Sequence, residues 1–169
     1  LQEIVGRMQR SVNLDRAEQQ QVNVNSLLKD VVYMVESQVK GKVQLEFDLG
    51  EVPEITVRPQ QISAVFSHLL HNAIDGTNGD GTNGDGKVTL SSRRRDHRIE
   101  VCVSDNGRGI PAEEVPAIFD PDFRIADDRI RSANWSLFGS RQIVREHGVD
   151  IQIQSQPGVG TRVTVQLPA

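Results

Sequence analysis

The chain has 169 residues, of which 37% are hydrophobic and 25% charged, and its formal net charge is −4. This length suits one domain with its own core. The single cysteine excludes a disulfide framework and structural zinc held by cysteines. No apolar run approaches the ~20 residues of a membrane span, and the acidic balance disfavours a nucleic-acid protein that depends on a basic surface.

Apolar spacing divides the first half of the chain into helices and short strands. The expected elements are a helix over 1–19, an edge strand over 20–24, a helix from Asn25 or Ser26 to about 39, a strand over 42–49, an extended piece over 54–57 and a helix from Pro59 to about 75. Asn25 or Ser26 is the expected N-cap of the second helix, and Gly41 ends it. The chain begins at Leu1 without Met, so we expect a piece of a longer protein.

The second half of the chain is predicted to contain two hairpins around one further helix. Residues 76–86 are a tandem glycine-rich repeat without apolar residues and are predicted to be a loop. The elements expected after it are strands over 87–92 and 98–104, a short helix over 112–118, a helix over 137–147 and strands over 149–155 and 161–167. Consecutive hairpins favour a mixed, mostly antiparallel sheet with helices on one face, which is an α+β, two-layer sandwich.

Asp105 opens the segment DNGRGI (105–110), which directly follows a predicted strand. The two glycines permit sharp turns and close approach of a ligand, and a fixed carboxylate there can accept a hydrogen bond from an exocyclic amine. The other interpretation is a generic Asp-Asn-Gly turn. PGVGT (157–161) has the same two interpretations, because glycines are the usual residues of hairpin turns.

His68 and Asn72 lie four residues apart and therefore on one face of the helix predicted from Pro59. A histidine there can orient or deprotonate a nucleophile, and an amide oxygen can bind Mg²⁺. The alternative is a solvated polar face on an amphipathic helix. In IFDPDF (118–123), two aromatic residues flank Pro121, and this segment can equally be a loop anchor that packs on the core.

The order of these motifs resembles the ATP-binding catalytic domain of sensor histidine kinases, which belongs to the Bergerat-fold ATPases. The resemblance covers about residues 22–168. It rests on FSHLLHNAID (66–75) as the N box, DNGRGI as the first glycine box, IFDPDF as the F box, RQIVREHG (141–148) as the helix after the second glycine box, and GVGTRVTVQLP (158–168) as the last glycine motif.

The resemblance implies a role for each matching residue. Asp105 would bind the adenine amino group, Asn72 would hold Mg²⁺ on the phosphates of ATP, and His68 would take part in catalysis. Further nucleotide-binding residues on this basis are Gly107, Gly109, Ile110, Phe119, Leu137, Gly158, Gly160 and Thr161. Phosphoryl transfer requires mainly positioning and charge neutralisation, so this set can suffice.

The second glycine box departs from the family pattern. Asn134 and Ser136 occupy the positions of two glycines that let backbone amides approach phosphates at a helix N-terminus. Ser136 can still cap the following helix. The loss of both glycines leaves a second hypothesis open, in which the chain is a pseudokinase that regulates a partner and binds nucleotide weakly or not at all. A gyrase-type ATPase is disfavoured because position 68 is not Glu.

The function expected from the resemblance is transfer of the ATP γ-phosphoryl group to a histidine outside this chain. Residues 1–19 would be the end of a dimerisation helix and residues 20–169 the catalytic domain. The expected partners are the phospho-accepting helix of the same protein, a response regulator receiver domain and a second subunit, without nucleic acid. The expected location of the domain is the cytoplasm. Attachment of the full-length protein to the membrane is left open. Cys102, inside a predicted strand, is expected to be a small core residue.

Overall fold

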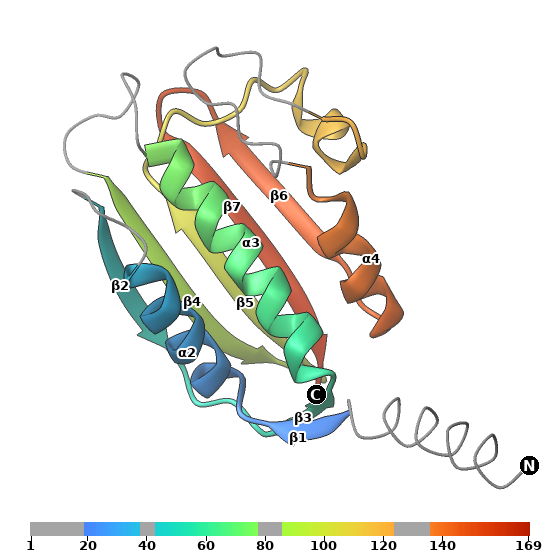
Figure 1. Ribbon diagram of the computed structural model, residues 1–169. Helices are drawn as coiled ribbons and strands as arrows, with labels where there is room; N and C mark the ends of the chain where they lie inside the picture. The colour runs from blue at the N-terminus through green and yellow to red at the C-terminus, as the bar shows by residue number, and fades with distance from the viewer. Residues whose placement is uncertain (1–18, 38–42, 78–85, 124–135) are drawn as a thin grey trace, which may run out of the picture.

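The computed structural model describes residues 19–37, 43–77, 86–123 and 136–169 (Figure 1). Most of the helix predicted over 1–19, the stop at Gly41, most of the loop predicted over 76–86, and Asn134 lie outside the described residues. No helix in the described part is long and apolar enough to cross a membrane.

A five-stranded sheet forms one layer of the domain. Its strands are β2 (Gln44–Leu49), β4 (Lys87–Arg95), β5 (Arg98–Asp105), β7 (Gly160–Pro168) and β6 (Ile151–Gln156), in that spatial order. β2 pairs with β4 in parallel, and every other pair is antiparallel. The predicted mixed, mostly antiparallel sheet is therefore confirmed. A separate two-stranded ribbon joins β1 (Gln20–Val22) to β3 (Ile55–Val57).

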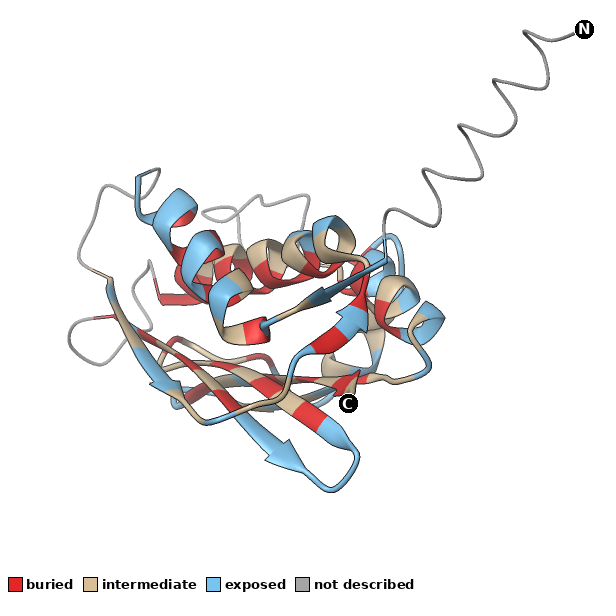
Figure 2. Ribbon diagram, turned by 90° about the horizontal axis from the view of Figure 1, so that it is seen from below, coloured by how far each residue is buried: buried red, intermediate tan, exposed pale blue. Residues whose placement is uncertain are grey.

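Three α-helices cover one face of this sheet, as the two-layer prediction requires (Figure 2). They are α2 (Val24–Glu36), α3 (Pro59–Thr77) and α4 (Phe138–Glu146). Alternate residues of β5 face the helices, with Ile99, Val101 and Val103 all buried. Cys102 has the opposite orientation and lies half-buried on the uncovered face, 3.8 Å from the Thr164 hydroxyl. The expectation of a core cysteine was therefore wrong, because side chains of a strand alternate between the two faces.

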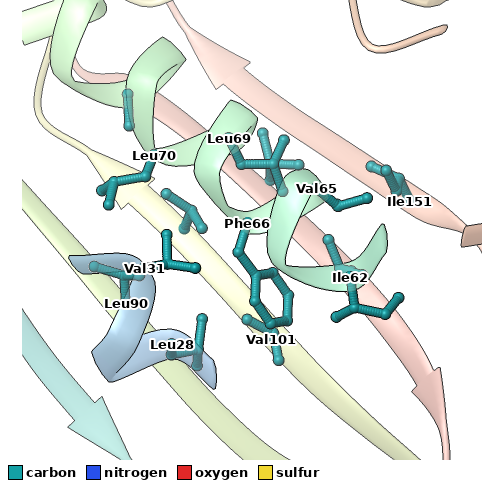
Figure 3. Close-up of a cluster of buried hydrophobic side chains, with 14 of the residues drawn as sticks. Leu28, Val31, Ile62, Val65, Phe66, Leu69, Leu70, Leu90, Val101 and Ile151 are labelled. Carbon is teal, nitrogen blue, oxygen red and sulfur yellow. The ribbon is translucent and has the colours of Figure 1, made fainter. Parts of the chain in front are cut away.

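The helix α3 lies at the centre of the core. Pro59 is its first residue, where a missing N–H costs nothing. Its predicted apolar face is fully buried, and Phe66 and its neighbours pack between α2, β4, β5 and β6 (Figure 3). Burying a side chain of this size contributes roughly 1.5–3 kcal/mol. This packing fixes the position of the polar residues that α3 also carries.

Two predicted helix boundaries differ from the structure. The N-cap of α2 is Asn23, whose Oδ1 accepts from the amides of Asn25 and Ser26 at 2.9 and 3.3 Å. Asn25 instead binds the Gly50 carbonyl through its side chain, so it fastens α2 to the sheet. The short helix expected over 112–118 is a 3₁₀ helix, η1 (Val115–Phe119), with proline in its first turn.

The end of α3 touches the start of β4. A Cβ atom added at Gly86 would lie 2.8 Å from the Cβ of Thr77, although eight residues separate the two described segments. The two described ends of the tandem repeat, Thr77 and Gly86, therefore lie side by side.

Candidate nucleotide site

A small pocket of about 20 Å³ lies between α3, the ends of β5 and β7, η1 and the start of α4. It is lined by Leu69, Asn72, Ala73, Val103, Asp105, Ile110, Ile118, Leu137, Ile153, Thr161 and Val163. An apolar wall with few polar groups is typical of ligand sites. Five of the predicted site residues line it: Asn72, Asp105, Ile110, Leu137 and Thr161.

Asp105 supplies the one carboxylate of this pocket. Burial raises its pKa from 3.8 to about 6, and hydrogen bonds from the backbone of Gly107 and Thr161 oppose that rise. The Gly107 amide donates to Asp105 Oδ1 at 2.9 Å, which fixes the orientation of the carboxyl group. A carboxylate held in this way presents its other oxygen as an acceptor. The predicted binding role is thus compatible with the geometry.

The glycines of the first and last motifs bring three backbone segments together and do not line this pocket. A Cβ at Gly107 would lie 2.2 Å from the Gly76 carbonyl oxygen, and one at Gly160 would lie 1.9 Å from that of Asp105. A Cβ at Gly109 would lie just as close to the backbone of Gln156. Sequence reasoning placed Gly107, Gly109, Gly158 and Gly160 at the nucleotide, whereas the structure places the first, second and fourth at backbone contacts beneath the site.

Hydrogen bonds join the same segments. The Arg108 amide donates to the Gly76 carbonyl at 3.2 Å, and the Gly158 amide donates to the Arg108 carbonyl at 2.8 Å. Gly158 itself is exposed, with open space where a Cβ would stand. The strand end that carries Asp105 is therefore held on one side by α3 and on the other by the β6–β7 turn.

Ser155 was not predicted and connects two residues that were. Its Oγ accepts from the Ile110 amide at 2.7 Å and lies 2.8 Å from Thr161 Oγ1. It stands on the same face of β6 as Ile151 and Ile153, where a polar residue requires a partner. That position on an inward strand face was the available signal.

Asn72 and His68 have different surroundings. Asn72 is only 8% exposed and lines the pocket, so the solvated-face interpretation is wrong for this residue. The pattern of the helix could not show that a second side of α3 is covered. His68 is half-buried one turn earlier and does not line the pocket.

The last wall is made by η1 and the start of α4. Ile118 and Leu137 are buried and line the pocket, and the Leu137 amide donates to the Ile118 carbonyl at 2.8 Å. Phe119 does not line the pocket and has the Arg141 guanidinium over its ring. The N-cap position of α4 is Leu137, and Ser136 Oγ accepts from the Phe138 amide at 3.2 Å. Ser136 thus caps the helix from one residue further out.

The family model of the histidine kinase-, DNA gyrase B- and HSP90-like ATPases matches residues 57–169, which include every residue of this pocket. The chain belongs to this ATPase family. Within the family, it is similar to the alginate biosynthesis sensor protein KinB of Pseudomonas aeruginosa, with 33% identity over 128 residues, 75% of this chain and 20% of KinB. The chain therefore spans about a fifth of the length of that relative.

Solved structures of this ATPase family have the same fold. The catalytic domain of histidine kinase ThkA is 24% identical with a TM-score of 0.74, over 89% of this chain and 95% of that one. Full-length ShkA in complex with AMPPNP is 18% identical with a TM-score of 0.76, over 89% of this chain and 31% of that one. The comparisons identify an ATP-binding catalytic domain of the sensor histidine kinase type.

Proposed function

We propose that this chain binds ATP in the Asp105 pocket and supplies the γ-phosphoryl group to a histidine outside residues 1–169. The observation that carries the proposal is the orientation of Asp105, a carboxylate fixed at the end of β5 inside an apolar pocket. Relatives of this chain are sensor histidine kinases by name, and one neighbouring fold holds an ATP analogue.

The chemistry of the pocket lining suits the adenine end of ATP. Leu69, Ile110 and Leu137 offer apolar walls for a flat ring, and Asp105 offers an acceptor for an exocyclic amine. Thr161, bonded to Ser155, stands beside Asp105 at the start of β7. A guanine ring has a carbonyl oxygen where adenine has the amine, so that oxygen would face the carboxylate.

Asn72 would hold Mg²⁺ with the phosphates. Among the described residues, no group of three or more His, Cys, Asp or Glu side chains could hold a metal ion. Mg²⁺ keeps several waters and needs only one or two protein oxygens beside substrate phosphates, so a single amide oxygen is sufficient. The bound ion would neutralise phosphate charge, while Asn72, fixed by the packing of α3, would orient the triphosphate away from the adenine pocket.

His68 is proposed to act at the phosphoryl group, since it lies one turn before Asn72 on α3. The proposed partners are the phospho-accepting helix of the same protein, with residues 1–19 as the end of its dimerisation hairpin, a response regulator receiver domain and a second subunit. We propose a cytoplasmic location for residues 20–169. No comparison supports the pseudokinase alternative.

Titration calorimetry with Mg-ATP and Mg-GTP tests the proposed site. We expect saturable binding of Mg-ATP and at least ~10-fold weaker binding of Mg-GTP, because a lost charged hydrogen bond costs about 1.5–3 kcal/mol. Equal affinity for the two nucleotides would remove Asp105 from adenine recognition. Absence of Mg-ATP binding would reject the catalytic function in favour of the regulatory one.

Replacing Ser136 with Gly is expected to tighten Mg-ATP binding about three- to tenfold. The Ser136 hydroxyl occupies the Phe138 amide, and the substitution frees that amide for a phosphate at the start of α4. Ser136→Ala also frees the amide but keeps the Cβ, so a smaller gain than with Gly would show that the Cβ obstructs the phosphate as well. Calorimetry that finds the same affinity for all three chains would show that this amide lies outside the phosphate site.

A further inference from the structure

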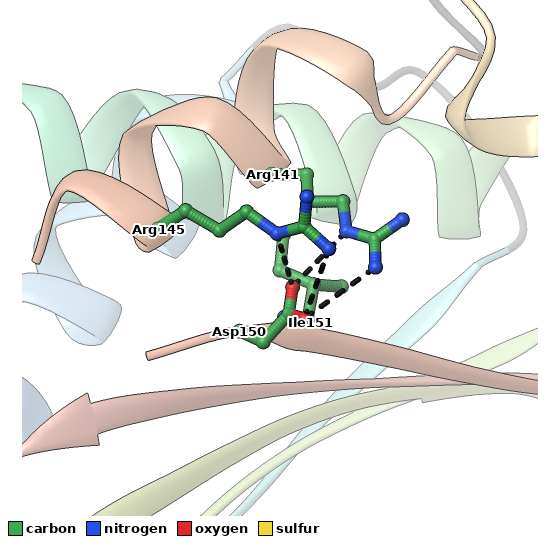
Figure 4. A network of polar contacts seen from close by, with 4 residues as sticks. All are labelled: Arg141, Arg145, Asp150 and Ile151. Atoms are coloured by element: carbon green, nitrogen blue, oxygen red, sulfur yellow. Dashed lines mark hydrogen bonds and ion pairs between the residues drawn. The ribbon is translucent and has the colours of Figure 1, made fainter. Parts of the chain in front are cut away.

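Three side chains outside the pocket form a continuous contact from η1 to the sheet. The Arg141 guanidinium carbon lies 4.2 Å from the centre of the Phe119 ring, which is a cation–π geometry. The same guanidinium binds Asp150, with Nε–Oδ1 at 3.1 Å and Nη2–Oδ2 at 3.4 Å (Figure 4). We name this set of Phe119, Arg141 and Asp150 the Phe119 clamp.

Asp150 is the fixed end of the clamp. Its Oδ1 accepts from the Ile151 amide at 2.8 Å, and its carbonyl oxygen accepts from the Gln166 amide at 3.1 Å. Burial acts to raise the pKa of Asp150, but bonds from Arg141, the Ile151 amide and Arg145 outweigh it and lower that pKa. The carboxylate is therefore charged and attached to the start of β6.

Phe119 is the other end of the clamp, and it adjoins the pocket wall at Ile118. Its neighbour Ile118 is buried in the pocket wall and bonds to Leu137 through its carbonyl oxygen. The Arg141 amide in turn donates to the Leu137 carbonyl at 2.9 Å. The clamp and the pocket wall thus share one turn of α4, and a displacement of the Phe119 ring would carry Ile118 with it.

The ion pair with Asp150 contributes too little to stability to explain why an arginine is needed at position 141. The Arg141 and Asp150 side chains are 30% and 40% exposed, and ion pairs with that much solvent contribute little to stability. Arg145, one turn later on the same helix face, binds the same two carboxylate oxygens at 3.3 Å (Figure 4). Arg141 differs from Arg145 in its contact with Phe119.

We propose that Arg141 is a positioning residue for the nucleotide pocket, which holds η1 against α4 by its contact with Phe119. This inference rests on the proposed function, because the proposed function makes this pocket the binding site for adenine. Arg141 does not line the pocket and needs no contact with the nucleotide. Its contact with Phe119 keeps Ile118 in position, and Ile118 then completes the apolar wall of the pocket.

The test compares Arg141→Met with Arg145→Met in the 169-residue chain. Both variants remove one cation from Asp150 and keep a long apolar side chain, but only the first removes the contact with Phe119. We expect Arg141→Met to weaken binding of Mg-ADP about three- to tenfold, with less than a twofold change for Arg145→Met. Arg141→Lys, which keeps the charge, should recover part of the loss.

Hydrogen exchange provides a readout that needs no nucleotide. The amides of Ala117 and Asp120, which close the 3₁₀ turns, should exchange faster in Arg141→Met and at the normal rate in Arg145→Met. Equal effects of both variants on affinity and exchange, or no effect of Arg141→Met on either, would overturn the proposal. If Arg141→Met does not fold, Phe119→Leu removes the ring alone and should accelerate the same amides.

The two readouts separate this proposal from the proposed function. If the unmodified chain does not bind Mg-ADP, the proposed function fails, while the exchange of Ala117 and Asp120 still decides whether Arg141 holds η1. If the unmodified chain binds and only the variants behave alike, the positioning role fails alone.

Discussion

Replacing Asp105 with Asn is expected to weaken Mg-ATP binding roughly 10- to 100-fold, because one charge-assisted hydrogen bond contributes about 1.5–3 kcal/mol. Asn keeps the shape of the side chain and an oxygen for the Gly107 amide, so the fold of the site should persist. Calorimetry at pH 8 measures the loss. An unchanged affinity would mean that Asp105 does not bind the base.

The same substitution is expected to raise stability at high pH. Burial raises the pKa of Asp105 to about 6 in the folded chain, from 3.8 without the fold. A raised carboxyl pKa favours folding at low pH, and this stability is lost as pH rises from about 4 through 6. The carboxylate therefore costs up to about 3 kcal/mol above pH 6, and Asn removes that cost.

Urea unfolding of both chains at pH 4 and pH 8 isolates this charge. The stability of Asp105→Asn relative to the unmodified chain should increase between the two pH values by about 1–3 kcal/mol. Effects of the amide group that do not depend on pH cancel in this difference. A constant difference would show that Asp105 titrates normally. Mg-ATP affinity of the unmodified chain should also fall below pH 6, since a protonated carboxyl group is a poorer acceptor.

Replacing Gly160 with Ala is expected to destabilise the domain by roughly 3–5 kcal/mol. Gly160 has a φ of 146°, and an added Cβ would lie 1.9 Å from the Asp105 carbonyl oxygen. The Gly160 backbone and the Asp105 carbonyl group lie at the paired ends of β7 and β5, so neither can move without breaking that pairing. Such a loss is a large part of the ~5–15 kcal/mol that holds a typical domain together.

Gly158 in the same turn is the matched control. It also has a positive φ, of 78°, but a Cβ there would meet no atom within 4 Å. Gly158→Ala should therefore cost only about 1 kcal/mol from backbone strain. Urea unfolding of the two variants separates strain from backbone contact. Similar losses for both would show that the close approach of Gly160 and Asp105 is unimportant.

The sheet, the three described helices and the position of Asp105 could be predicted from the sequence because each depends on local patterns. The apolar face of α3 and the hairpin turn at Asp96 each depend on residues that are close together in the chain, and the structure confirms both. The DNGRGI segment directly follows a strand, so the end of that strand was an evident place for a ligand.

The rest depended on residues that are far apart in the chain. The close contact of Gly107 with Gly76, thirty-one positions earlier, and that of Gly160 with the Asp105 carbonyl could not be predicted from a local pattern. Asn72 was ambiguous because a helical pattern does not show what covers the second side of a helix. Ser155 was missed because its partners belong to two other segments.

The contact between Thr77 and Gly86 has a consequence for how this protein can vary. The tandem TNGDG units begin and end at neighbouring points, so their number sets only the length of a closed loop. Loop-closure entropy grows with the logarithm of length, and one five-residue unit more or fewer changes it by less than about 1 kcal/mol. The stability of the domain therefore places little constraint on the number of repeat units.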